Sequence, residues 1–142
     1  MSFVVVDASI WVSRLVPQDE FHLLCKSWLA QKRTAGTILV SPTLLLVEVA
    51  GAISHRTGDT TLAERAVQNL EHLTSLRLVE MGQTVIETAA ALAAKLGMRG
   101  ADAIYVAVAQ HLNIGLATLD EDQRNKASKV ISIEILNPQS GH

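Results

Sequence analysis

Short runs of branched and large apolar residues alternate along the chain with longer amphipathic segments. The short runs predict five strands, which cover Phe3–Val6, Ile38–Ser41, Leu76–Glu80, Gly115–Leu119 and Val130–Ile133. Strands that alternate with helix-length segments are typical of parallel sheets covered by crossover helices. The pattern therefore predicts an α/β fold, in which one three-layer α/β/α domain surrounds a central, mainly parallel sheet.

The segments between these strands have the spacing of helices. Between the first two strands we expect one helix, with an apolar face formed by Phe21, Leu24, Cys25, Trp28 and Leu29. Pro42 stands where a helix over Thr43–Arg56 would begin, a position at which a missing N–H costs little. A helix over Leu62–Leu73 would be capped by Thr60 or Thr61, since an acidic residue follows Thr61 by three positions.

Two further helices are expected in the second half of the chain. The alanine-rich segment Gln83–Leu96 predicts a helix that ends at Gly97. Ala101–Leu112 is apolar on nearly every side, so its helix should be buried. No repeat or linker divides the sequence. We therefore expect a single domain over residues 1–136 and a polar C-terminal tail over residues 137–142.

Composition adds limits to this picture. The chain has 142 residues, 49% of them hydrophobic, which is enough to bury a core. Its 12 Lys and Arg against 14 Asp and Glu exclude a strongly basic nucleic-acid binder on bulk charge. One cysteine excludes a disulfide framework and a zinc site of four cysteines. We see neither a membrane span nor a signal peptide, and so expect a cytoplasmic protein.

Glu48 is an acid in an apolar setting. Its helical neighbours at three and four residues are leucine, glycine and alanine, and no Lys or Arg of its own helix can pair with it. An unpaired carboxylate against a core costs several kcal/mol, roughly, in free energy of folding. Glu48 must therefore be protonated, reach the surface, pair with a distant cation or bind a metal, and we favour a functional carboxylate that faces a cleft.

Three more acids stand at the ends of expected elements. Asp7 and Asp120 directly follow the first and fourth strands, and ligands of open α/β sheets bind outside such strand ends. Each is equally well suited to be a helix N-cap. Asp102 opens the buried helix, where it would complement the helix dipole or pair with Arg99. Four such acids together favour a shared site, because converging carboxylates repel each other unless a cation neutralises them. Oxygen ligands without nearby His or Cys suit Mg²⁺ or Mn²⁺.

The motifs around these acids resemble those of the PIN-domain nuclease family, and above all the VapC-type toxin ribonucleases. They are Val6-Asp7-Ala8-Ser9, Leu45-Leu46-Val47-Glu48-Val49, the segment Gly100-Ala101-Asp102-Ala103-Ile104-Tyr105 and the strand exit Thr118-Leu119-Asp120. Their order and spacing match the family over nearly the whole chain. The resemblance implies that Asp7, Glu48, Asp102 and Asp120, hereafter the acidic quartet, hold one or two Mg²⁺ or Mn²⁺ ions and are catalytic.

The resemblance also implies what surrounds the quartet. Ser9 and Thr118 match polar positions that orient ligands or phosphate, while Asp122 either assists Asp120 or is simply a solvated acid in the first turn of a helix. Arg99 and Arg124 are the expected contacts to RNA phosphates, because they neighbour the acids.

The implied activity is metal-dependent hydrolysis of RNA phosphodiester bonds with a 5′-phosphate product. A toxin of this type pairs with a small antitoxin protein, and we expect a homodimer from the high apolar fraction. Two alternatives remain within the fold: a PIN nuclease of RNA processing that is not a toxin, and a catalytically silent interaction module. Other α/β classes fit less well. A haloacid-dehalogenase-like phosphatase needs an acid where Ser9 stands, a response-regulator receiver needs paired acids, and no glycine-rich phosphate loop is present.

The quartet also changes the meaning of the net charge. Without it the chain has 10 acidic residues against 12 basic ones, so the site alone carries −4 and the remainder +2. The overall charge of −2 is therefore compatible with a nucleic-acid substrate.

Overall fold

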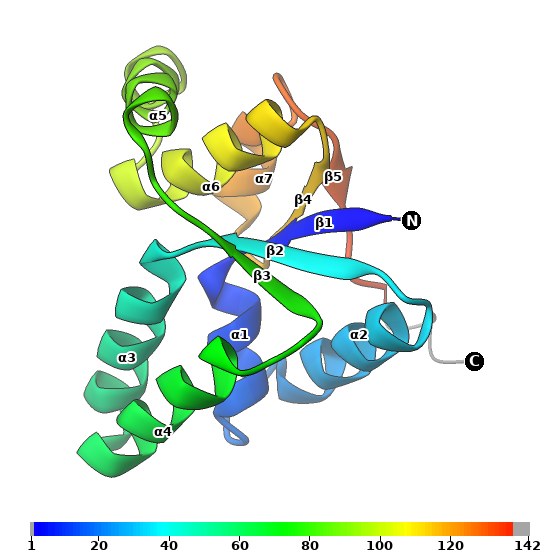
Figure 1. Cartoon of the computed structure of the whole chain (residues 1–142), viewed down its shortest axis with the longest axis vertical. Helices are drawn as coiled ribbons and strands as arrows, with labels where there is room; N and C mark the ends of the chain where they lie inside the picture. Colours follow the sequence, from blue (N-terminus) through cyan, green and yellow to red (C-terminus); the bar gives the residue numbers. More distant parts are fainter. Residues whose placement is uncertain (1, 138–142) are drawn as a thin grey trace.

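The computed structural model describes residues 2–137 and consists of one sheet with helices on both faces (Figure 1). All strand pairings are parallel, and the strand order is β3-β2-β1-β4-β5. The strands are β1 (Phe3–Val6), β2 (Ile38–Pro42), β3 (Leu76–Val79), β4 (Gly115–Ala117) and β5 (Ile133–Glu134). Because the chain leaves β1 for β2 on one side and returns to β4 on the other, the order reverses between β1 and β4. The predicted three-layer α/β/α fold is confirmed, with a sheet that is wholly parallel in the described residues.

Seven helices are present in the described residues. They are α1 (Ala8–Leu15), α2 (His22–Thr34), α3 (Leu44–Thr57), α4 (Thr60–Glu71), α5 (Gln83–Leu96), α6 (Gly100–Leu112) and α7 (Glu121–Ala127). Helices α1 to α4 cover one face of the sheet, and α6 and α7 lie on the other, with α5 packed on α6 (Figure 1). An ion pair between Lys32 of α2 and Glu134 links β5 to the first group of helices.

The core lies between the central strands and these two helical layers. Val4, Val5 and Val6 are buried on both faces of the sheet, as expected for a parallel strand in the centre. Helix α6 is the most buried helix of its layer, with Val106 and Ala107 fully inaccessible. Its predicted burial is confirmed, except that Leu112 at its last turn is exposed. The helix over Gln83–Leu96 ends at Gly97 as predicted, in the left-handed conformation that glycine adopts without strain.

Several local predictions are wrong for identifiable reasons. Two helices, not one, join β1 to β2: the missed helix α1 begins directly after β1 and is rich in residues that also favour strands. Pro42 ends β2 instead of opening a helix. The missing N–H breaks no bond to β1 there, because β1 pairs with β2 only as far as Val40. Helix α4 is capped by Asp59, whose side chain accepts from the Leu62 N–H at 3.0 Å, and not by a threonine.

The last two strands differ from the predicted ranges: β4 ends earlier, and β5 is shorter and starts later. β4 ends at Ala117 because side chains take over the next amides: Leu119 N donates to Ser9 Oγ, and Asp120 N donates to Thr118 Oγ1. β5 starts only at Ile133, since the N–H groups before it still bond to Ala127 at the end of α7.

The predicted tail falls largely outside the described residues, which end at residue 137. Among the described residues, no helix has the length and apolarity that crossing a membrane requires.

Candidate functional site

The acidic quartet gathers at the carboxyl edge of the sheet, where the strand order reverses. Asp7 follows β1, Asp120 follows β4, Asp102 lies in the first turn of α6, and Glu48 lies in the second turn of α3. Ligands of open parallel sheets bind at such a reversal point. The structure therefore brings together four residues that are spread over 114 positions of the sequence, from 7 to 120.

Asp7 and Asp120 are both helix N-caps. Asp7 Oδ2 accepts from the Ser9 N–H at 3.2 Å and so caps α1. Asp120 Oδ1 accepts from the Gln123 N–H at 3.1 Å and so caps α7. The capping interpretation that the sequence allowed is thus correct for both residues. It does not use up either carboxylate, because an N-cap engages only one oxygen at a time.

Hydroxyl groups fix the carboxylate of Asp7, which is buried at 6% exposure. Thr118 Oγ1 lies 3.0 Å from Asp7 Oδ2 and 2.8 Å from Gln123 Oε1, and its single proton can be donated to either. Ser9 Oγ lies 3.3 Å from Thr118 Oγ1. Ser9 and Thr118 therefore lie beside the quartet, where the sequence analysis expected polar groups, and they restrict how Asp7 can turn.

Glu48 is held by a residue that the sequence analysis did not single out. Tyr105 donates its hydroxyl to Glu48 Oε1 at 2.7 Å, across the sheet edge from α6 to α3. Tyr105 is three residues after Asp102, so both lie on the same face of α6, and this spacing was the available signal. The pKa of the fully buried Tyr105 hydroxyl is raised far above its ordinary value, first by burial and then by its bond to Glu48, so it remains a donor.

The carboxylates of the quartet repel one another. Burial raises the pKa of Glu48, the Tyr105 hydrogen bond opposes this, and the charges of Asp7 and Asp102 raise it further. Burial also raises the pKa of Asp102, where Arg99 opposes the rise while Asp7 and Asp120 add to it. Both shifts mean that charge is costly here without a cation. The site is therefore electrostatically suited to bind positive charge.

Two cationic residues lie next to the quartet in different ways. Arg99 contacts two of its members: Nε lies 3.2 Å from Asp102 Oδ2 and Nη2 lies 2.9 Å from Asp120 Oδ2. Arg124 instead donates from Nη1 to the backbone carbonyls of Thr118 at 3.1 Å and Leu119 at 3.3 Å. Arg124 therefore supports the strand exit that carries Asp120, and its expected contact to an RNA phosphate stays a prediction.

The remaining site candidate is Asp122. Its side chain is 74% exposed and pairs with Lys126 one turn later at 2.9 Å. The structure thus places Asp122 on the solvated face of α7, which fits the simpler of the two interpretations. A buried residue of the same helix, Gln123, was missed: it bridges Thr118 and the backbone carbonyl of Asp102, the latter at 3.5 Å, and nothing in its local sequence marks it.

The donor set of the quartet fits a hard divalent ion, since it offers carboxylate oxygens and no nitrogen or sulfur. Hydrogen bonds within the described residues use one oxygen each of Asp7, Glu48 and Asp102, which leaves the second oxygen of each without a protein donor. Within residues 2–137, Ser75 Oγ is the one fully buried side-chain oxygen that lacks a hydrogen-bond partner. Because the second oxygen of Asp7 also lacks a protein donor, it is not fully buried and is reached by solvent. In this conformation, however, no three His, Cys, Asp or Glu residues of the described chain are arranged to hold an ion together.

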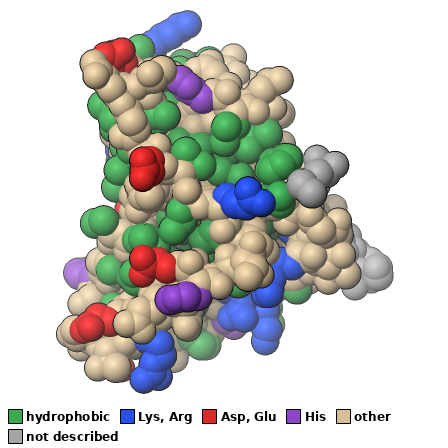
Figure 2. All heavy atoms as spheres, in the orientation of Figure 1, with side chains coloured by type: hydrophobic (Ala, Val, Ile, Leu, Met, Phe, Trp, Pro, Cys, Tyr) green, Lys and Arg blue, Asp and Glu red, His purple; other side chains and the backbone are tan. Residues whose placement is uncertain are grey.

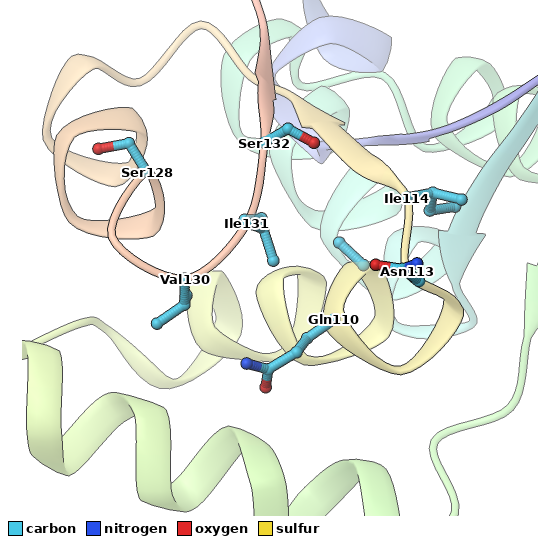
Figure 3. Close-up of a pocket in the computed structure, with 8 residues that line it drawn as sticks. Gln110, Asn113, Ile114, Ser128, Val130, Ile131 and Ser132 are labelled. Carbon is cyan, nitrogen blue, oxygen red and sulfur yellow. The ribbon is translucent and has the colours of Figure 1, made fainter.

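A pocket lies near the start of β4, away from the quartet (Figure 3). This pocket of about 370 Å³ is lined by Ala109, Gln110, Asn113, Ile114, Ser128, Val130, Ile131 and Ser132. It adjoins the start of β4, whereas the quartet lies beyond its end. None of its lining residues is charged, so it offers no carboxylate, imidazole or amine for acid–base chemistry.

Solved structures with the same fold include a toxin and a toxin–antitoxin complex. VapC20 of Mycobacterium tuberculosis, a sarcin–ricin loop cleaving toxin, is 20% identical with a TM-score of 0.77, over 92% of this chain and 98% of that one. FitAcB of Neisseria gonorrhoeae is 18% identical with a TM-score of 0.68, over 96% and 98%. VapBC2 of Rickettsia felis, bound to a promoter DNA fragment, is 13% identical with a TM-score of 0.67, over 95% and 99%. At these identities the likeness shows the fold alone.

At the level of sequence, no curated protein matches the chain. The sequence model of the PIN domain, in contrast, matches residues 4–129, which include all four acids, strands β2 to β4 and all of β1 but its first residue. The match agrees with the parallel five-stranded sheet and with the acids at its carboxyl edge. The chain belongs to the PIN domain family.

Proposed function

We propose that this protein is an endoribonuclease dependent on Mg²⁺ or Mn²⁺ and that the acidic quartet is its active site. The observation that carries the proposal is that the four acids lie at the reversal point of the sheet, near enough for their charges to raise the pKa of Glu48 and of Asp102, with only the exposed Arg99 as a cation against them. Membership of the PIN family and the toxin neighbours support a nuclease. RNA as the substrate and the metal dependence are part of the proposal.

Asp7, Glu48, Asp102 and Asp120 would hold the metal. When bound, it supplies a water molecule of lowered pKa and neutralises charge that develops on the phosphate. The chain's own residues orient the ligands: the Ser9–Thr118 pair restrains Asp7, and the Tyr105 hydroxyl restrains Glu48. No protein nucleophile is needed: the oxygen of water would bond to phosphorus, the bond between phosphorus and the 3′ oxygen would break, and the proton from water would end on the 3′ oxygen, which leaves a 5′-phosphate and a 3′-hydroxyl.

We further propose that the protein is the toxin of a toxin–antitoxin pair and acts in the cytoplasm. The support is that the structural neighbours include a solved toxin–antitoxin complex. A small antitoxin would then cover the acidic site, and a guanidinium group suits such a partner because it can replace a metal as counter-charge. A PIN nuclease of RNA processing remains the second candidate, and the expression experiment below separates the two.

Cleavage of RNA by the purified chain tests the active site. The wild type should cut a labelled single-stranded RNA in Mn²⁺ and lose this activity in EDTA. Asp7→Asn should lower the rate on the order of 100-fold or more, since even supporting partners of metal ligands contribute 10- to 100-fold. Asparagine is also a good N-cap, so the variant should keep helix α1 and the fold.

The matched control is Glu64→Gln, the same change at an exposed carboxylate on α4, which should leave the rate unchanged. Full activity of Asp7→Asn, or of the wild type in EDTA, would contradict the proposed site. A DNA oligonucleotide of the same sequence tests the choice of RNA. Expression in bacterial cells should arrest growth for the wild type and not for Asp7→Asn. Normal growth with an active wild-type enzyme would instead favour RNA processing.

A further inference from the structure

Arg99 bridges two carboxylates that come from different elements. It is the N-cap residue of α6, and its guanidinium reaches Asp102 in its own helix and Asp120 beyond β4. Adjacent nitrogens of the guanidinium group make the two contacts. Nε lies 3.2 Å from Asp102 Oδ2, and Nη2 lies 2.9 Å from Asp120 Oδ2. The planar guanidinium group is thus positioned between the two carboxylates and is a counter-charge that both share.

The bridge affects the conformation of the proposed metal ligands. The Oδ2 atoms of Asp102 and Asp120 both face Arg99, while the other oxygen of Asp120 caps α7. Asp120 therefore has both oxygens engaged, and no three acids of the described chain are arranged to hold an ion. For a metal to bind the Oδ2 atoms of both aspartates, the bridge must open.

The Arg99 side chain is well placed to leave. It is 76% exposed, and exposed ion pairs are weak because water screens them. Arg124 provides the contrast: its contacts are to two backbone carbonyls, so it cannot swing away without loss of support for the strand exit. The two neighbouring arginines therefore make different types of contact. Of the two, only Arg99 pairs with carboxylates of the quartet and can release them without loss of support for the strand exit.

We propose that Arg99 is a positioning residue that competes with the divalent ion for Asp102 and Asp120, so that metal binding displaces its guanidinium from the quartet. This inference rests on the proposed function, because it concerns the same site. It predicts that a chain without the guanidinium binds metal more tightly. A single residue then both stabilises the metal-free acids and sets the metal concentration at which the site fills.

Metal affinity, measured by isothermal titration calorimetry with Mn²⁺ alone, tests the competition on the full chain. Arg99→Met should lower the Kd about 3- to 10-fold, the size expected for loss of two exposed ion pairs. Arg99→Lys should also lower it, by a smaller factor, because an ammonium is a point charge that cannot bridge both acids as a fork does. The matched control is Arg65→Met on α4, an exposed arginine without an ion pair in the described chain, which should bind as the wild type does.

A second readout follows the arginine itself. In ¹H–¹⁵N spectra the Nε–H signal of Arg99, assigned by its loss in Arg99→Met, should shift as diamagnetic Mg²⁺ is added. The Nε–H signal of Arg65 should stay in place. Together, a tighter Kd and a moving Arg99 signal establish displacement without any measurement of activity.

The outcomes separate this inference from the proposed function. If the wild type binds Mn²⁺ and Arg99→Met binds it no more tightly, or if the Arg99 signal does not move, the competition is overturned while the metal site stands. If Arg99→Lys binds Mn²⁺ with the Kd of the wild type and only Arg99→Met has a lower Kd, the effect comes from net charge and not from the bridge. The proposal is then again overturned. If neither the wild type nor Arg99→Met binds Mn²⁺, both proposals fail.

Discussion

Single carboxylates in this protein serve more than one structural purpose, and Asp19 shows it away from the proposed site. Its Oδ1 accepts from Ser13 Oγ at 2.7 Å and from the Phe21 N–H at 2.9 Å, and its Oδ2 pairs with Arg56 at 2.9 Å. These bonds connect three parts of the chain, which are helix α1, the loop that precedes α2, and helix α3. Asp19 therefore ties together the helical layer on one face of the sheet.

The charge of Asp19 should contribute to stability in a defined pH range. Burial raises the pKa of Asp19, but the bonds from Phe21, Ser13 and Arg56 outweigh it, so the pKa lies below the ordinary value of 3.8. A carboxyl whose pKa is lowered on folding stabilises the fold above its ordinary pKa, and this contribution fades as the pH falls through the lowered value.

Urea unfolding of the wild type and of Asp19→Asn should therefore show a less stable variant at pH 7. The difference should shrink when the pH drops below about 4, where the carboxyl of the unfolded chain begins to take up a proton, and should fade as the pH falls through the lower pKa of the folded state. Glu64→Gln serves as the control and should change stability little at either pH. An Asp19→Asn variant as stable as the wild type at pH 7 would show that the charge contributes nothing.

Single residues also show where sequence reasoning reaches its limit. Asp7 and Asp120 could be located because each directly follows a predicted strand, and Glu48 because it lacks a partner in its own helix. The bridge from Arg99 to Asp120 and the bond from Tyr105 to Glu48 span 21 and 57 positions. Such contacts depend on how the elements pack in three dimensions, so the local spacing of residues along the chain predicted only part of each contact.

Helix α7 depends on the residue that is also the last member of the quartet. Asp120 Oδ1 caps it, and Asp120 Oδ2 belongs to the proposed site. Two substitutions separate these contributions, because asparagine caps a helix about as well as aspartate, while alanine does not.

Asp120→Asn should keep the thermal stability of the wild type, whereas Asp120→Ala should lose about 1 kcal/mol. Both should lose most of the Mn²⁺-dependent RNA cleavage. Circular dichroism melts and the cleavage assay measure the two effects on the same preparations. If Asp120→Asn cleaves RNA at the wild-type rate, Asp120 is a cap and not a ligand.

At the scale of elements, the predictions succeeded where one signal dominated. The strand over Phe3–Val6 and the helix over Gln83–Leu96 have the predicted bounds, because β-branched residues in the one and alanines with a terminal glycine in the other leave little choice. Pro42 and helix α1 were misjudged because tertiary contacts decided. The pairing of Pro42 with Val79 favours the strand, and burial of Ile10 and Trp11 under the sheet favours the helix.

Several large apolar side chains lie exposed on the surface of the described molecule. Figure 2 shows hydrophobic side chains over much of one face, with acidic side chains spaced singly among them. An apolar groove of about 200 Å³ between α5 and α6 is lined by Ile86, Ala89, Ala90, Ala93, Gly100 and Ile104. Ile86 is 44% exposed there. Such a groove is suited to an interface, and we propose a homodimer with a second copy of the chain packed along α5.

Light scattering coupled to gel filtration should give the mass of a dimer for the wild type. Ala90→Glu places a charge in the groove and should give a monomer, without loss of helix α5, because glutamate is a good helix former. Glu87→Ala, at an exposed position one turn earlier, is the control and should remain dimeric. A wild-type monomer at high concentration, or a dimeric Ala90→Glu, would contradict this interface.

The charge of the molecule is divided in a way that suits both a metal and a nucleic acid. The quartet carries four negative charges and the remainder of the chain a net charge of +2. Bound divalent ions would neutralise the site and leave a mildly basic molecule to meet the phosphate backbone. Every functional proposal here therefore depends on whether the four carboxylates take up a metal together.

Anomalous diffraction at the manganese edge, from crystals of the full chain soaked in Mn²⁺, measures this most directly. We predict a strong peak within coordination distance of Asp7 and of at least one further member of the quartet, with the Arg99 guanidinium turned away from Asp102 and Asp120. Crystals of Asp7→Asn soaked in the same way should lack the peak. Crystals of the wild type with no peak at the quartet, or with manganese only elsewhere on the surface, would contradict the central claim.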